Sequence, residues 1–150
     1  MEIATYNLAG IQLTAGEGAL SGLKEEADRL HIKKPLIVTD EGVRAAGIIE
    51  TMAGHLKKEK IAYEIYDGVK TDPLDTMVKD GLSVFRESRC DGILSIGGGS
   101  SMDVGKCISV MSVHPGDILD YARSTPEHKI FKKEAALSSQ SRLLRGPGAK

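Results

Sequence analysis

The chain has 150 residues, which suits a single buried core and excludes a complete large enzyme. Its 41% hydrophobic and 27% charged residues are typical of a globular protein and exclude a disordered or fibrous one. Basic residues number 20 against 21 acidic ones and aromatic residues make up 4%, so the chain lacks the charge and the stacking surfaces that nucleic-acid binding needs.

The first half of the chain alternates short apolar runs with longer amphipathic segments, a pattern typical of βαβ units. Residues 11–14 predict a weak strand, and residues 18–30 predict a helix because apolar side chains recur there at helical spacing. Residues 35–40 predict a stronger, mostly apolar strand that ends in an acid. Residues 42–56 then predict one helix, despite the glycines within it.

The second half continues the same alternation. A strand is expected over residues 62–66, and Pro73 is expected to begin a helix that runs to Ser88. The apolar face of this helix is expected to include Leu74, because apolar residues follow it at helical spacing. Residues 92–96 predict a buried strand that leads into a run of glycines.

The last clear helix is expected to start at Ser100. Cys107 lies among its apolar positions and is therefore expected in the core. A short helical stretch is expected over residues 118–123, and the sequence shows no internal repeat. Together these elements predict an α/β fold with a doubly wound, mostly parallel sheet, helices on both faces and its final strands missing.

The three glycines between the predicted buried strand and the helix from Ser100 suit an anion. They bring bare backbone N–H groups close to a ligand, and the helix start adds unpaired donors and partial positive charge. A phosphate or diphosphate would fit there. Ser100 or Ser101 could instead cap the helix, and Asp103 would complete a capping box with Ser100. On the turn alone, both an anion site and a purely structural turn stay open.

Two nucleotide-binding motifs fail on the same residues. The Rossmann fingerprint requires glycine where Met102 stands. A P-loop would require glycine at Ser100 and Ser or Thr at Cys107, so Gly105 and Lys106 do not form a Walker motif. Any dinucleotide bound here is therefore bound in another way.

Other classes of site have little support. No apolar run approaches the roughly 18 to 20 residues of a membrane span, and residues 1–9 do not resemble a signal peptide, so a cytoplasmic location is expected. Cys90 and Cys107 form no CxxC pair, which argues against a disulfide scaffold or a local metal site. His114 and His128 are expected at the surface near loops, without a functional role.

The segment 95–106 resembles the GGGSxxDxxK signature of the iron-containing (group III) alcohol dehydrogenase family. The resemblance runs in unbroken order over residues 10 to 125. Besides the signature it rests on five short stretches: Leu-Ile-Val-Thr-Asp ending at Asp40, residues 66–69, Asp72 with Pro73, residues 90–92 and residues 116–121.

The resemblance implies an amino-terminal α/β domain that binds NAD(P), and a helical domain, outside these residues, that holds iron or zinc through an Asp and three His. In the intact family the metal polarises the alcohol oxygen and hydride passes to the nicotinamide, giving an aldehyde or ketone. Glycerol dehydrogenase and dehydroquinate synthase share this cofactor domain, so a Rossmann-like, dehydroquinate synthase-like sheet is implied. Small alcohols or aldehydes are the implied substrates, and the family is often dimeric or larger.

The resemblance also implies which residues contact the cofactor. Gly98, Gly99 and Ser100 would hold the diphosphate, with Gly97 making the turn. Asp40 would accept hydrogen bonds from the adenosine ribose, and its charge would favour NAD over NADP. The complete implied set is Asp40, Asp72, Gly97, Gly98, Gly99, Ser100, Asp103 and Lys106.

These residues also have plainer interpretations. Asp72 stands where the family commonly has Asn, and Asp103 would orient the cofactor or its loop. Asp40 could simply end a strand, and Lys106 could be a solvated helix residue. No catalytic residue and no metal ligand is expected within this chain.

Residues 135–150 do not fit the predicted domain of residues 1–134. They are polar, basic and without periodicity, which suggests a non-native or disordered tail. The family would continue with a buried strand and a second loop. If Ser139 to Gly148 were encoded by suitable codons, translation from one base upstream would give the string Ile-Ala-Ile-Pro-Thr-Thr-Ala-Gly-Thr-Gly, which resembles the family. We therefore hypothesise a frameshift shortly before Ala135, which the coding DNA would test.

The sequence thus predicts the cofactor-binding part of an NAD-dependent, metal-dependent alcohol dehydrogenase, inactive on its own. Two other hypotheses stay open. The chain could be a non-catalytic dinucleotide-binding module, or a non-functional fragment of a disrupted gene.

Overall fold

The computed structural model describes residues 3–8, 11–124, 126–131 and 142–143. Near its amino terminus, β1 (Ala4–Leu8) and β2 (Ile11–Ala15) form an antiparallel hairpin, followed by a 3₁₀ helix, η1 (Ala19–Gly22), and by α1 (Leu23–Arg29). The strand expected over residues 11–14 is confirmed. The sequence analysis did not predict its partner β1.

The central sheet is parallel and has the strand order β4-β3-β5-β6. Its strands are β4 (Glu64–Val69), β3 (Pro35–Asp40), β5 (Gly92–Ser95) and β6 (Arg142–Leu143). Strand β3 pairs with β4 on one side and with β5 on the other, so it is an interior strand of the sheet. The described pair Arg142–Leu143 lies beside β5, and the rest of the predicted tail is outside the described residues.

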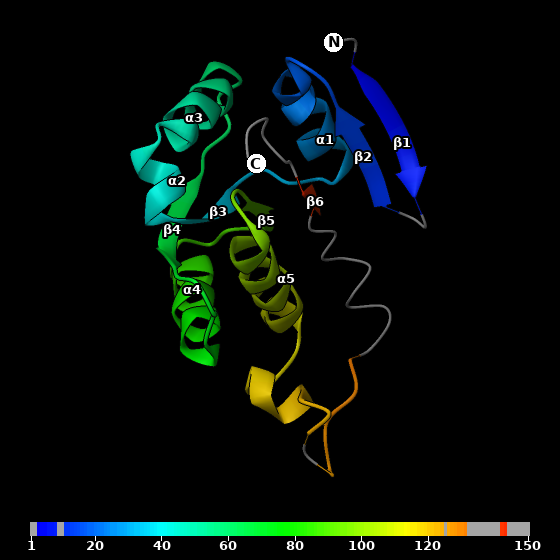
Figure 1. Ribbon diagram of the computed structural model, residues 1–150, viewed down its shortest axis with the longest axis vertical. Helices are drawn as coiled ribbons and strands as arrows, with labels where there is room; N and C mark the ends of the chain where they lie inside the picture. Colours follow the sequence, from blue (N-terminus) through cyan, green and yellow to red (C-terminus); the bar gives the residue numbers. More distant parts are fainter. Residues whose placement is uncertain (1–2, 9–10, 125, 132–141, 144–150) are drawn as a thin grey trace.

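Helices cover both faces of this sheet (Figure 1). They are α2 (Glu41–Ala45), α3 (Ile48–Lys58), α4 (Asp75–Glu87) and α5 (Gly99–Val113). Alternate residues of β3 separate two cores: Leu36 and Val38 pack with residues of α4 and α5, while Ile37 packs with residues of α1 and α3. All three are 0% exposed, and burying each such side chain stabilises the fold by about 1.5–3 kcal/mol. The doubly wound α/β prediction is confirmed.

The prediction of a single helix over residues 42–56 is wrong in one respect, because this segment forms two helices, α2 and α3. Gly47 adopts a left-handed conformation, with φ of 74°, and this ends α2 and begins α3. The strand expected over residues 62–66 also lies later, because pairing with β3 continues to Val69. Asp67 and Gly68 are typical turn residues, but this local preference does not outweigh the pairing with β3.

The start of α4 also differs from the prediction. Pro73 lies two residues before the first residue of α4, Asp75, and Leu74 has the extended backbone of an N-cap. Leu74 is 60% exposed and does not belong to the apolar face. The residue before the helix leaves the helical path, so its side chain points away from the face that the spacing predicted.

His114 is buried, which contradicts its predicted surface position. It is 5% exposed, and its Nδ1 lies 2.8 Å from the carbonyl oxygen of Val110, in the last turn of α5. The rings of Tyr121 and Phe131 meet its ring edge-on, at centroid distances of 5.7 and 5.1 Å, and they stack on each other at 4.4 Å. The chain folds back after Gly116, and this return covers a ring that sequence position alone placed at a loop. Cys107 packs against the α4/α5 core as predicted, and burial raises the pKa of its thiol.

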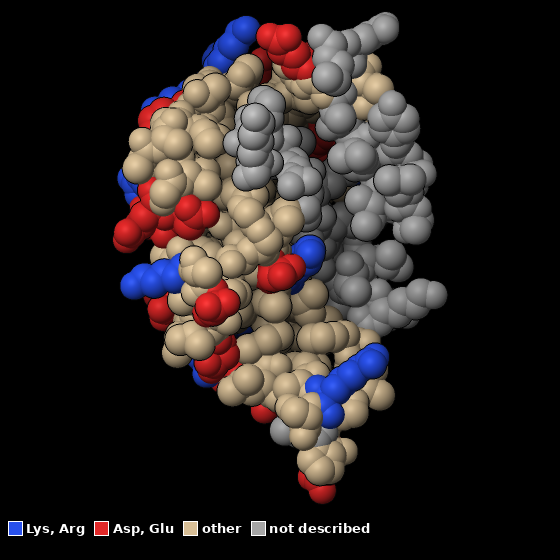
Figure 2. Space-filling model, viewed as in Figure 1, with Lys and Arg blue, Asp and Glu red and all other residues tan. Residues whose placement is uncertain are grey.

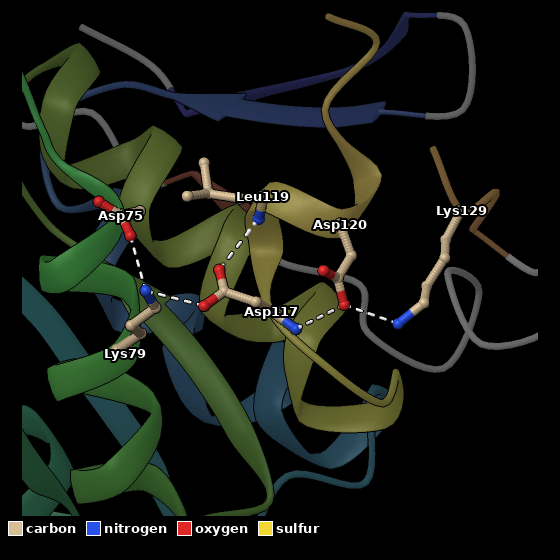
Figure 3. Close-up of polar contacts among 6 residues, drawn as sticks. All are labelled: Asp75, Lys79, Asp117, Leu119, Asp120 and Lys129. Carbon is tan, nitrogen blue, oxygen red and sulfur yellow. Dashed lines mark hydrogen bonds and ion pairs between the residues drawn. The ribbon is translucent and has the colours of Figure 1, made fainter. Parts of the chain in front are cut away.

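One exposed ion pair joins the segment that follows α5 to α4, and further polar contacts lie within α4 and within that segment (Figure 3). Lys79 of α4 lies 2.7 Å from Asp75 and 2.8 Å from Asp117, the N-cap of the 3₁₀ helix η2 (Ile118–Tyr121). Asp120 accepts from the backbone N–H of Asp117 at 3.1 Å and pairs with Lys129 at 2.6 Å. Hydrogen bonding to these ammonium groups lowers the pKa of both Asp117 and Asp120.

The face of the molecule shown in Figure 2 has mixed charge. On the face shown in Figure 2, acidic and basic side chains are interspersed and do not form one continuous patch of either sign. Within the part of the chain that the structure describes, none of the helices combines the length and the apolar character that would let it traverse a lipid bilayer.

Candidate functional site

A cleft of about 460 Å³ opens where the carboxyl ends of β3, β4 and β5 meet. After β3 the chain continues into α2, and after β5 it continues into α5 on the opposite face of the sheet. In open α/β sheets, ligands bind at such points because neighbouring loops diverge and leave a crevice. The cleft is lined by Asp40, Glu41, Gly42, Val69, Lys70, Thr71, Gly98, Gly99, Ser100 and Ser101.

The glycine turn forms one wall of the cleft. Gly97 has a φ of 139°, which L side chains rarely adopt, and Gly98 is the N-cap of α5 without any side-chain capping bond. A Cβ added at Gly98 or Gly99 would meet no heavy atom of the described residues within 4 Å, apart from chain neighbours. The start of the 15-residue helix α5, where the first backbone N–H groups have no partner within the helix, therefore borders the open space of the cleft. This space fits an anion of the size of a diphosphate.

The predicted serine caps are wrong. Helix α5 begins at Gly99, one residue earlier than expected, so the capping position falls on a glycine that has no side chain to donate or accept. Asp103 does not close a capping box with Ser100. Instead it pairs with Lys106 at 3.0 Å, and both side chains are at least half exposed.

Asp40 is held by two hydrogen bonds. Its Oδ1 accepts from the backbone N–H of Val43 at 2.9 Å, which makes Asp40 the N-cap of α2. Its Oδ2 accepts from the hydroxyl of Ser101 at 3.1 Å. Asp40 ends β3, as its plainer interpretation states, and its role as the cap of α2 was not predicted. The carboxylate also lines the cleft, where its remaining lone pairs can accept from a ligand.

Charges of both signs border the cleft. Asp40 and Glu41 lie at the end of β3, and Lys70 directly follows the last residue of β4, the strand that pairs with β3. No salt bridge joins Lys70 to any residue that the structure describes. Its ammonium group is therefore available to a negatively charged ligand in the cleft.

The structure brings together only part of the predicted set. Asp40, Gly98, Gly99 and Ser100 line the cleft, with Gly97 directly behind them. Asp72 is not among the lining residues: it follows Thr71 and has a left-handed φ of 54°. Asp103 and Lys106 also lie outside the lining, as an ion pair on the exposed side of α5.

Sequence reasoning missed six lining residues: Glu41, Gly42, Val69, Lys70, Thr71 and Ser101. Five of them lie at or just after the last residue of β3 or β4, so they could have been found by treating every carboxyl strand end as part of the site. Extending the third predicted strand to Val69 would have been needed first. Ser101 had been considered only as a helix cap.

The part of the chain that the structure describes contains no cluster of side chains suited to hold a metal ion. There, no three His, Cys, Asp or Glu side chains lie close enough together to hold a metal ion. The open glycine turn and the cleft beside it fit the dinucleotide that the resemblance implies, whereas the described residues offer no such group of ligands for iron.

A parallel sheet with helices on both faces and a glycine turn at its carboxyl edge defines a Rossmann-like α/β domain. The sequence profile of the family "iron-containing alcohol dehydrogenase" matches residues 12–139. The chain belongs to this family, and the resemblance drawn from its sequence is confirmed.

Individual relatives agree with this assignment. The 1,3-propanediol dehydrogenase of Citrobacter freundii is 43% identical over 109 residues, which are 71% of this chain and 28% of that enzyme. The NAD-dependent methanol dehydrogenase of Bacillus methanolicus is 36% identical over 106 residues, again 71% of this chain and 28% of the relative. A crystal structure of 1,3-propanediol oxidoreductase matches with a TM-score of 0.68 and 43% identity, over 71% of this chain and 28% of that one. The chain thus spans little more than a quarter of the length of these relatives.

Proposed function

We propose that this chain binds a nicotinamide dinucleotide as the cofactor-binding part of an NAD-dependent alcohol dehydrogenase. The diphosphate would lie over Gly98, Gly99 and Ser100, and the adenosine ribose beside Asp40. The observation that carries the proposal is the glycine turn. It lies at the start of α5 and opens into the cleft at the carboxyl ends of β3, β4 and β5. A purely structural turn would need neither the open space nor the cleft.

The charges of the cleft favour NAD over NADP. The carboxylate of Asp40 can accept hydrogen bonds from ribose hydroxyls, whereas a 2′-phosphate at the same place would be repelled. Lys70, which also lines the cleft, supplies a positive charge there. Bound NAD would supply the hydride acceptor, and the residues of this chain would bind and orient it.

A charge placed in the turn tests the proposal. The backbone of Gly98, with φ of −82° and ψ of −168°, is open to any residue, and aspartate is a favoured N-cap. We therefore expect Gly98→Asp to retain or raise stability and to abolish NADH binding, measured by NADH fluorescence. Gly98→Asn, which adds similar bulk without charge, separates repulsion from filling of the space.

The same titration separates the three hypotheses for the wild-type chain. Saturable NADH binding that Gly98→Asp removes supports the cofactor-binding proposal. A folded chain that binds no NADH would show that the glycines only make a turn. A chain without binding and with molten behaviour, judged by near-UV circular dichroism and dye binding, would support a non-functional fragment.

A further inference from the structure

We propose that Ser101 is a positioning residue for Asp40, and that through Asp40 it sets the discrimination between NADH and NADPH. The inference rests on the proposed function of the cleft and names the residue that controls its specificity. Its basis is the hydrogen bond that joins the first turn of α5 to the end of β3.

The bond is well placed to fix the carboxylate. Ser101 is 1% exposed, so solvent does not compete for its hydroxyl, which donates to Oδ2 of Asp40 at 3.1 Å. The other oxygen, Oδ1, accepts from the backbone N–H of Val43 at 2.9 Å. With one partner on each oxygen, both side-chain torsions of Asp40 are set, and its plane is fixed by two different elements.

Gly97 makes this contact possible. A Cβ at Gly97 would lie 2.8 Å from Oγ of Ser101 and 3.0 Å from Oδ2 of Asp40, closer than such atoms normally approach. The glycine turn therefore has a second role besides exposing backbone donors. It leaves room for the Ser101 hydroxyl to reach across from α5 to β3.

The charge of Asp40 is not neutralised by this arrangement. No salt bridge joins Asp40 to any described residue, and its partners are a hydroxyl and a backbone N–H. Its negative charge therefore stays at the cleft, where it accepts from a ribose diol and repels a 2′-phosphate. Without the Ser101 hydroxyl, the carboxylate would be free to turn about its remaining bond, and both effects would weaken.

The test uses the full 150-residue chain and measures dissociation constants for NADH and NADPH by fluorescence titration. We expect Ser101→Ala to raise the NADH constant about fivefold and to reduce the preference over NADPH by a similar factor. In an Asp40→Asn background the same substitution should leave the preference unchanged, because the charge it positions is gone. Ser112→Ala, on the same helix but far from the cleft, should behave as the wild-type chain.

The possible outcomes are distinct. A wild-type chain that binds no NADH would overturn both this inference and the proposed function. If the wild-type chain binds NADH but Ser101→Ala weakens NADH and NADPH equally, the proposed function stands and the positioning role is refuted. If Ser101→Ala does not fold, Ser101→Cys keeps the volume and weakens the donor, so the same comparison is made with that variant.

Discussion

Gly97 and Gly47 both have a positive φ, of 139° and 74°, but the space around them differs. A Cβ at Gly47 would meet nothing within 4 Å, whereas a Cβ at Gly97 would press on Ser101 and Asp40. We expect Gly47→Ala to cost about 1–2 kcal/mol of unfolding free energy from backbone strain alone. Gly97→Ala should cost about 3 kcal/mol or more, because crowding adds to strain. Urea unfolding of both variants measures the difference, and equal costs would show that the crowding is relieved without loss.

At the same scale, the sequence identified Asp40 and the glycines but not what joins them. The strand pattern placed Asp40 at a carboxyl strand end, and the signature placed the glycines before a helix. The bond between Asp40 and Ser101 spans 61 residues of sequence, so it depends on how β3 and α5 are packed. Local patterns contain no information on that packing, and the same reason applies to the buried ring of His114.

At the scale of elements, α5 packs unusually close to β5. A Cβ at Gly105 would lie 1.9 Å from Oγ of Ser95, whose buried hydroxyl has no hydrogen-bond partner among the described atoms. Within a helix, alanine is more favourable than glycine by about 1 kcal/mol, so the contact with Ser95 decides whether Gly105→Ala stabilises or destabilises the chain. We expect Gly105→Ala to destabilise the chain by about 2 kcal/mol or more.

A second substitution checks the cause of that loss. Ser95→Gly removes the hydroxyl and the Cβ that a residue at position 105 would meet. In chemical denaturation, Gly105→Ala should cost less in the Ser95→Gly background than in the wild-type chain. Additive costs would indicate that the close approach of α5 and β5 is not what limits position 105.

The ion pair between Lys79 of α4 and Asp117, the N-cap of η2, predicts a pH dependence of stability. Hydrogen bonding to Lys79 lowers the pKa of Asp117 in the folded chain, so the contribution of this pair is present above the unfolded aspartate value of about 3.9 and is lost as pH falls through the folded value. Lys79→Gln should therefore lower stability slightly near pH 6, and the difference from wild type should shrink towards about pH 2.

Urea unfolding over a pH series measures this effect. Lys57→Gln, at an exposed lysine of α3 without an ion pair among the described residues, is the matched control and should show no such trend. A constant difference for Lys79→Gln across the series would mean that Lys79 acts through packing and not through its carboxylate partners.

The elements that the sequence predicted best are those with the strongest local signal. The apolar run of β3 and the helical spacing of α5 matched the structure within one residue at their starts. The break at Gly47 was missed because glycine inside a helical pattern is often tolerated. The shift of β4 to residues 64–69 follows from pairing with β3, which is a property of the sheet and not of the segment.

At the scale of the whole molecule, the chain belongs to a family of enzymes but matches only part of their length. The family is named for iron-containing alcohol dehydrogenases, yet this chain spans about 28% of the length of its relatives. The hypothesised frameshift would account for the tail if the coding DNA, read from one base upstream, gives the family's string. Sequencing the locus tests that proposal, since codons for residues 139–148 that do not give the family's string would refute it.

The resemblance assigns cofactor binding and metal binding to two different domains, and this separation predicts the activity of the chain. Hydride transfer from an alcohol needs its oxygen activated, and the resemblance assigns that task to a metal whose ligands it places outside this chain. The assay supplies the purified 150-residue chain with NAD, with ferrous or zinc ions, and with ethanol, butanol or 1,3-propanediol, and follows NADH formation by absorbance at 340 nm. We expect no NADH formation above the rate in buffer, even if titration shows that the chain binds NADH. A full-length relative assayed in parallel is the positive control. Metal-dependent NADH formation by the chain itself, abolished by Gly98→Asp, would show that catalysis does not require the rest of the family's enzyme.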